Sequence, residues 1–153
     1  MKKLKLFFIF LTINLGSLAI GSLLMQNGPQ TDWFINLNQA PWTPPGWVFG
    51  TAWTTIMICF SIYLAYLFTG NVSKDIKTAF TLQVLLNIMW NYVFFNQHLI
   101  LLGLINIIIL TVIVYYLFFK TNKELDTIRF LLLPYMIWLI VATSLNAYIL
   151  LNN

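Results

Sequence analysis

Charged side chains are scarce in this chain, and their scarcity is the first constraint on what the protein can be. Eight Lys or Arg and four Asp or Glu make up 8% of its 153 residues. A soluble domain carries roughly 25% charged residues. The composition therefore excludes an ordinary soluble fold. Basic residues this sparse also exclude a nucleic-acid surface, so we expect no nucleic-acid partner.

Groups that perform acid–base, nucleophilic or metal chemistry are also scarce. A single histidine, His98, and a single cysteine, Cys59, cannot by themselves form a metal cluster or an internal disulfide. For His98 we favour a solvated turn over a role as a haem-iron ligand. The carboxylates lie outside the long apolar stretches, so we predict no catalytic residue, no metal site and no obligatory cofactor. They are Asp32, Asp75, Glu124 and Asp126.

What the chain has instead is long apolar stretches. Hydrophobic residues make up 60% of it and aromatic residues 17%. At about 1.5 Å per residue, a helix of about 20 residues crosses a hydrocarbon core of about 30 Å. We therefore predict an all-α integral membrane bundle, one domain over residues 1–153. Its expected transmembrane helices are residues 6–25, 46–69, 78–97, 99–119 and 129–151.

The positions of the basic residues support five crossings and indicate an orientation. Only the short polar turn 96–98 separates the third stretch from the fourth, and merging the two would scatter the basic residues over both sides. With five helices, all of them fall on one side, which the positive-inside rule assigns to the cytoplasm. We expect a bacterial cytoplasmic membrane, with the N-terminus in the cytoplasm and the C-terminus outside. The basic residues are Lys2, Lys3, Lys5, Lys74, Lys77, Lys120, Lys123 and Arg129.

Tryptophan and proline gather in one segment. Residues 29–53 hold four of the six tryptophans and four of the five prolines. Proline fixes φ and restricts the residue before it, so Pro41, Pro44 and Pro45 predict an ordered turn that ends at the start of a helix. Tryptophan favours the membrane–water interface, and an interfacial anchor is the simplest interpretation of this segment taken alone.

Three predicted helices each carry an aromatic face, and two of these faces also carry amides. Such faces can enclose a cavity that suits a large planar apolar molecule with a few polar atoms. Ordinary packing and hydrogen bonding between helices are the alternative. At helical spacing, the faces are Trp53, Met57, Phe60 and Leu64; Gln83, Asn87, Trp90 and Phe94; and Tyr135, Trp138, Ala142 and Asn146.

Three motifs in sequence order give the chain a close resemblance to the TspO/MBR family, the tryptophan-rich sensory proteins and translocator proteins. The resemblance covers nearly the full length. The motif residues are the run 42–49 with Trp53; Gln83 with Asn87 and Trp90; and the pair 134–135 with Trp138, Ala142, Leu145 and Asn146.

The resemblance implies a five-helix bundle in the lipid bilayer whose cavity binds porphyrins or other apolar small molecules. It implies a receptor or sensor of tetrapyrroles and stress, with a possible homodimer. The alternatives are a passive transporter of porphyrins or lipids, and a protein that degrades porphyrins in light through Trp53 and Trp138. The loop from Trp33 to Pro45 would cover the cavity. The implied ligand-binding residues are Trp33, Trp42, Pro44, Pro45, Trp53, Asn87, Trp90, Trp138, Ala142 and Asn146.

The chain departs from the family pattern at several positions. Ala40 stands where a proline usually precedes the first motif tryptophan by two residues, and residues 51–52 replace a Pro-Val pair. Leu102 stands where animal members carry tryptophan, so we expect benzodiazepine-type ligands to bind poorly. After Leu145 no Lys or Arg completes a cholesterol-recognition pattern, so we do not expect cholesterol transport.

Overall fold

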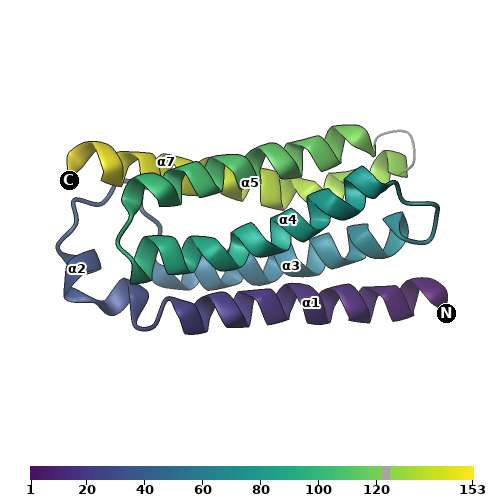
Figure 1. The fold of residues 1–153 in the computed structure, drawn as a ribbon, viewed down its shortest axis with the longest axis horizontal. Helices are drawn as coiled ribbons and strands as arrows, with labels where there is room; N and C mark the ends of the chain where they lie inside the picture. Colours follow the sequence, from purple (N-terminus) through teal and green to yellow (C-terminus); the bar gives the residue numbers. More distant parts are fainter. Residues whose placement is uncertain (122–124) are drawn as a thin grey trace.

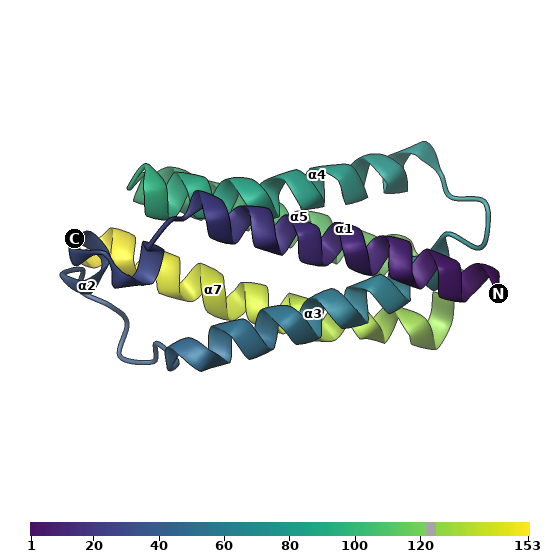
Figure 2. The ribbon, with the colours of Figure 1, turned by 90° about the horizontal axis from the view of Figure 1, so that it is seen from below.

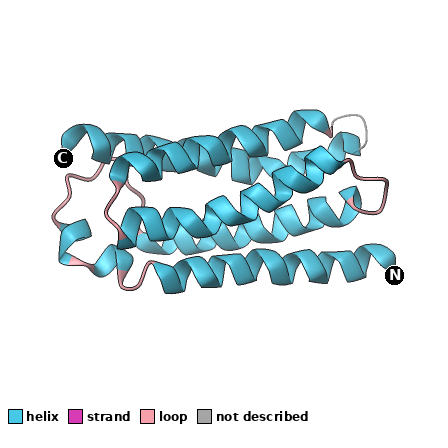
Figure 3. Cartoon of the chain, viewed as in Figure 1, coloured by secondary structure: helices cyan, strands magenta, loops and turns pink. Residues whose placement is uncertain are grey.

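Five long helices run alongside one another in the computed structural model, and all five are long and apolar enough to cross a membrane. The structure describes residues 1–121 and 125–153, so Lys123 and Glu124 lie outside the described residues. No β-strand occurs within those two ranges. The all-α membrane bundle is confirmed (Figures 1 and 3). The long helices are α1 (Lys2–Leu24), α3 (Gly46–Leu67), α4 (Lys74–Asn91), α5 (Ile100–Lys120) and α7 (Leu133–Asn152).

The helix boundaries differ from the predicted ones mainly where caps and tighter turns intervene. Helix α4 begins four residues earlier than expected because the Ser73 hydroxyl accepts a hydrogen bond from the Ile76 N–H, at 3.4 Å. Its far end widens into the π-helical turn Tyr92–Asn96. The last span begins with a 3-10 turn, Asp126–Leu132, before Pro134 opens α7 in its first turn.

Helices α1, α4 and α7 run in one direction and α3 and α5 in the other, so the bundle has two distinct ends (Figures 1 and 2). Helix α1 contacts α3 and α4, while α5 contacts α4 and α7, and α3 contacts α7. The N-terminus, Lys74 and Lys120 lie at one end, which we name the basic end. The C-terminus and the short helix α2 (Asp32–Ile35) lie at the opposite end, which we name the capped end.

The densest packing lies in the half of the bundle near the basic end. Phe60, Tyr63 and Leu64 on α3 are completely buried, and the Phe60 and Tyr63 rings stack at 5.9 Å. Between α1 and α3, the Asn14 amide donates a hydrogen bond to the Ser61 hydroxyl, at 2.9 Å. Since no water competes for such groups inside a bilayer, this contact holds the two helices in register.

The segment between α1 and α3 folds across the capped end. It contains the 3-10 turn Gly28–Gln30 and α2, and it reaches α3 through Pro44 and Pro45. Pro45 is extended, with φ of −57° and ψ of 149°, and Gly46 begins the helix. The prediction of a proline turn that ends at a helix start is confirmed.

Hydrogen bonds to the C-terminal part of the chain help to tie this segment to the rest of the bundle. The Asn38 amide donates to the carbonyl oxygen of Asn152, at 2.9 Å, and its backbone N–H donates to Asn153 Oδ1, at 2.8 Å. The Trp42 indole N–H donates to Ser144 Oγ, at 3.1 Å. These contacts join the segment to the last turns of α7, so it forms a cap over the bundle.

Candidate ligand-binding site

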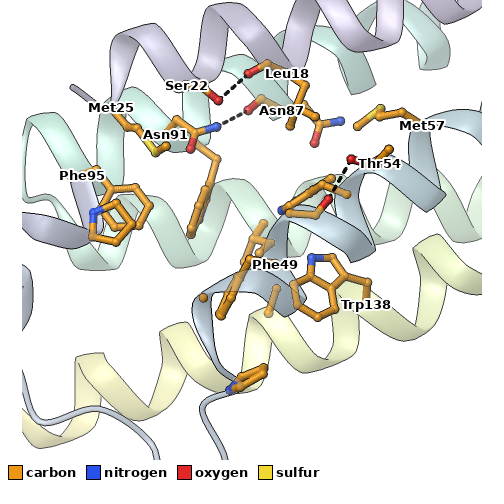
Figure 4. A pocket seen from close by; sticks show the side chains of 18 of the residues that line it. Leu18, Ser22, Met25, Phe49, Thr54, Met57, Asn87, Asn91, Phe95 and Trp138 are labelled. Carbon is orange, nitrogen blue, oxygen red and sulfur yellow. Dashed lines mark hydrogen bonds between the residues drawn. The ribbon is translucent and has the colours of Figure 1, made fainter. Parts of the chain in front are cut away.

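A cavity of about 480 Å³ lies beneath the cap, in the half of the bundle near the capped end (Figure 4). Ligand pockets commonly enclose about 300–1,000 Å³ and are mostly apolar, with a few placed polar groups. All five long helices and the cap contribute to its lining. The cavity therefore has the size and the composition of a small-molecule site.

Aromatic rings form much of its wall and are held in place by other rings. Trp138 on α7 meets Phe49 on α3 edge to face, with ring centroids 5.2 Å apart. Trp90 on α4 stacks on Phe94 at 5.2 Å, with only 8° between the planes. Trp53 on α3 packs edge to face on a buried tyrosine. Three tryptophans from three helices thus line one cavity in fixed orientations.

A network of buried hydrogen bonds fixes the position of the Asn87 side chain, an amide of the site. The Tyr135 hydroxyl on α7 accepts hydrogen bonds from the Gln83 amide, at 3.0 Å, and from the Asn87 amide. Asn87 also donates to the Gln83 carbonyl oxygen, at 3.1 Å. Since both Asn87 N–H groups are used, its Oδ1 remains as an acceptor at the cavity wall. Gln83 and Tyr135 therefore position Asn87 without lining the cavity themselves.

Two indole donors are buried in the same wall without a partner. Within the described part of the chain, neither Trp90 Nε1 nor Trp138 Nε1 has a hydrogen-bond partner. A buried donor left unpaired costs about 1–3 kcal/mol. A ligand with acceptor atoms would recover part of that cost through small rotations of the two rings. The lining thus includes the amide of Asn87, and two of its tryptophans carry buried indole N–H groups without a partner in the described ranges.

The structure gathers most of the predicted ligand-binding residues around this cavity. Phe49, Gly50 and Met57 join them from α3, and Ile107 and Leu110 close the wall on the α5 side. The predicted residues that line the cavity are Pro44, Trp53, Asn87, Trp90, Trp138 and Ala142. Their part in binding stays a prediction.

The remaining predicted residues lie outside the lining. Trp33 stacks on His98 at 4.0 Å and joins the cap to the turn between α4 and α5. His98 is solvent-exposed, as predicted, but its stacking on Trp33 was not foreseen. Trp42 binds Ser144, and Pro45 precedes the first turn of α3.

Asn146 is also outside the lining, between α5 and α7. Its side chain is only 2% exposed, and its amide atoms have no hydrogen-bond partner within the described ranges. The amide nitrogen lies 3.3 Å from the position that a Cβ on Gly103 would occupy. A glycine at this point is therefore what allows α5 to approach the asparagine.

Sequence reasoning missed the contribution of α1. Ser17, Leu18 and Ser22 on α1 line the cavity together with Met25, just past the end of the helix, and Asn91 on α4. No periodic aromatic or amide pattern marks this face, so the sequence held no signal that separates a cavity wall from a packing surface.

The comparisons with known proteins agree with the architecture. The model of the TspO/MBR family matches residues 8–151. The tryptophan-rich protein TspO of Archaeoglobus fulgidus is 33% identical over 139 residues, which cover 87% of each chain. The tryptophan-rich sensory protein of Cereibacter sphaeroides is 31% identical over 146 residues, 92% of this chain and 87% of that protein. Protein CrtK of Rhodobacter capsulatus is 32% identical over 120 residues, 74% of each chain. With five membrane-spanning helices and a family match over nearly its whole length, the chain is an integral membrane protein that belongs to the TspO/MBR family.

Proposed function

We propose that the protein is a membrane sensor that binds a porphyrin, or a related tetrapyrrole, in the cavity beneath the cap. The observation that carries this proposal is the convergence of Trp53, Trp90 and Trp138 from three helices on one cavity of about 480 Å³. A planar macrocycle offers two large apolar faces for indole rings. Its burial would gain roughly 25 cal/mol for each Å² of apolar surface.

The polar groups of the wall suit the same class of ligand. A free-base porphyrin carries pyrrole N–H donors, ring nitrogen acceptors and carboxylate side chains. Asn87 Oδ1 would accept from a protonated carboxylic acid at the edge of such a ligand, and the indoles of Trp90 and Trp138 would donate to its carboxylate oxygens. Binding would then satisfy groups that are left unpaired in the free protein.

The orientation proposed is N-terminus in the cytoplasm and C-terminus outside, in a bacterial cytoplasmic membrane. Lys2, Lys74 and Lys120 at the basic end support it, because basic residues concentrate on the cytoplasmic side of membrane proteins. The cavity and its cap would then face the outer leaflet.

A second candidate function is light-dependent breakdown of the bound porphyrin. The observation that favours it is that Trp53 and Trp138, the two tryptophans that the resemblance connects with this chemistry, line the same cavity. Light absorbed by the porphyrin would activate dissolved O2, whose atoms add to the macrocycle. This chemistry needs no acid–base residue.

The test is a titration of protoporphyrin IX into the purified protein in the dark, followed by tryptophan fluorescence. We expect saturable quenching, and about tenfold weaker binding in Trp53→Phe and Trp138→Phe, which equals about 1.4 kcal/mol each. Trp47→Phe is the matched control, because Trp47 is 72% exposed and outside the cavity lining.

Quenching that never saturates would refute a porphyrin site in the cavity. An equal loss of affinity in Trp53→Phe, Trp138→Phe and Trp47→Phe would also refute it. Illumination of the complex then tests the second candidate. New absorbing products that form in the parent protein and not in Trp53→Phe or Trp138→Phe would support breakdown of the ligand.

A further inference from the structure

Side-chain contacts join helices α1 and α3 in the half near the basic end. There, Lys2 Nζ donates to the Thr69 carbonyl oxygen at 3.2 Å, the Phe10 and Phe68 rings lie 4.8 Å apart, and Asn14 binds Ser61. Figure 2 shows the two helices separating toward the capped end. The bundle therefore holds α1 against α3 near the basic end, and the two helices diverge from there.

Toward the capped end, α1 packs on α4. A Cβ added at Gly21 would lie 2.6 Å from the amide nitrogen of Asn91, so the two helices are in close contact at this point. Asn96 on the π-helical turn also donates to the Leu24 carbonyl oxygen, at 3.1 Å. These contacts tilt the outer half of α1 toward α4 and leave a gap beside α3.

Exposure follows the same division around the cavity. Ser22 on α1 and Gly46, Gly50 and Thr54 on α3 line the cavity and are exposed. On the α3 face deeper in the bundle and on α5 the lining is buried, and Met57, for example, is 1% exposed; on α7, Trp138 is buried and Ala142 half-buried. The cavity is therefore closed toward the bundle interior and open between α1 and α3.

The rim of this gap has the chemistry of a surface that faces lipid. Ser22 Oγ donates to the Leu18 carbonyl oxygen at 3.0 Å, and Thr54 Oγ1 donates to the Gly50 carbonyl oxygen at 2.8 Å (Figure 4). Each hydroxyl is thus satisfied within its own helix and needs no water. Apart from the chain neighbours and the backbone of α3 itself, no atom lies within 4 Å of a Cβ built at Gly46 or Gly50, so the rim is also open.

Compared with the gap between α1 and α3, the route from the aqueous side through the cap is obstructed. The cap is held by the hydrogen bonds of Asn38 to Asn152 and Asn153, by the bond from Trp42 to Ser144, and by the Trp33–His98 stack. A ligand arriving from the aqueous side would have to displace these contacts. A ligand arriving between α1 and α3 would displace only lipid.

We propose that the gap between α1 and α3, rimmed by Ser22, Gly46, Gly50 and Thr54, is a lateral portal to the cavity. Its substrate class is a planar amphiphile already dissolved in the leaflet at the capped end. This inference rests on the proposed function, and it makes the protein a reader of the ligand concentration in the membrane and not of that in the surrounding water.

The test measures exchange rates in lipid nanodiscs preloaded with protoporphyrin IX, with tryptophan quenching as the signal. Gly50→Leu places a branched side chain in the portal. Gly16→Leu is the matched control, since Gly16 also has no atom within 4 Å of its Cβ position and does not line the cavity. We expect association and dissociation both to slow at least tenfold in Gly50→Leu and to stay unchanged in Gly16→Leu.

Two further variants, one in the portal and one in the cap, keep the outcome decisive. Ser22→Leu narrows the portal from α1, and it should slow exchange as Gly50→Leu does, even if Leu at position 50 also weakens equilibrium binding. The double change Asn38→Ala and Asn153→Ala loosens the cap, and it should leave both rates unchanged.

The results separate the two proposals. Parent protein that shows no saturable binding would refute the proposed function. If the parent protein binds porphyrin saturably, and Gly50→Leu and Ser22→Leu exchange porphyrin at the same rates as the parent, the portal is refuted and the proposed function is not. Exchange that accelerates tenfold when the cap is loosened would also refute the portal, because the ligand would then enter from the aqueous side.

Discussion

The two halves of the bundle use the same residue types for opposite purposes. Near the basic end, aromatic side chains fill space: Phe10, Phe60 and Phe80 meet in one cluster, and the Tyr63 hydroxyl lies 3.1 Å from Thr121 Oγ1. Near the capped end, aromatic side chains such as Trp53, Trp90 and Trp138 stand around a cavity. One half holds the helices in position, so the other half can keep a cavity open.

Removal of a ring from each half gives the largest expected contrast. Phe60→Ala should lower the free energy of unfolding by about 3–5 kcal/mol, because the side chain is fully buried and leaves a cavity. Phe49→Ala should cost about 1 kcal/mol, because Phe49 already borders empty space. Thermal unfolding in detergent measures both. Equal losses would show that the halves do not differ in packing.

A methyl group added on α1 tests the contact that tilts this helix. Gly21→Ala brings a Cβ to 2.6 Å from the Asn91 amide, which must move, so we expect a loss of about 1 kcal/mol, at the low end of overpacking costs. Gly16→Ala has open space and should gain about 0.5–1 kcal/mol from reduced backbone entropy. The measurement is the difference in thermal midpoint. A gain of stability in Gly21→Ala would show that α1 and α4 are not in tight contact.

Loosening of the cap should have the smallest effect on stability. Asn38→Ala with Asn153→Ala removes exposed hydrogen bonds and should change the free energy of unfolding by about 0.5 kcal/mol or less. Hydrogen exchange should nevertheless accelerate at the backbone amides of residues 31–43, where the cap would open locally. Unchanged exchange with a large loss of stability would mean that the cap is part of the core.

Much of the architecture was predictable because a bilayer leaves few alternatives. Long apolar stretches must form helices, and the basic residues separated the third span from the fourth. The boundaries were less accurate at α4 and before α7, where the Ser73 cap and a 3-10 turn decide where the helix begins. Hydropathy does not register either feature.

The candidate site was predictable only in part, and the division has a physical cause. Helical spacing placed Asn87 and Trp90 on one face and Trp138 on another, and all three line the cavity. Asn146 continues the pattern of Trp138 by two turns but lies between α5 and α7, outside the lining. Periodicity says which residues share a face, and it does not say how far along the helix that face borders empty space.

By itself, the sequence determined that this protein crosses the membrane with five helices and that its aromatic and amide residues fall on shared faces, because apolar length and helical periodicity are local properties. Only the tertiary structure decided where the helices separate. That depends on contacts between distant residues, such as Asn14 with Ser61 and Gly21 with Asn91, which hold α1 to α3 at one end and to α4 at the other. The cavity and its opening arise from that divergence.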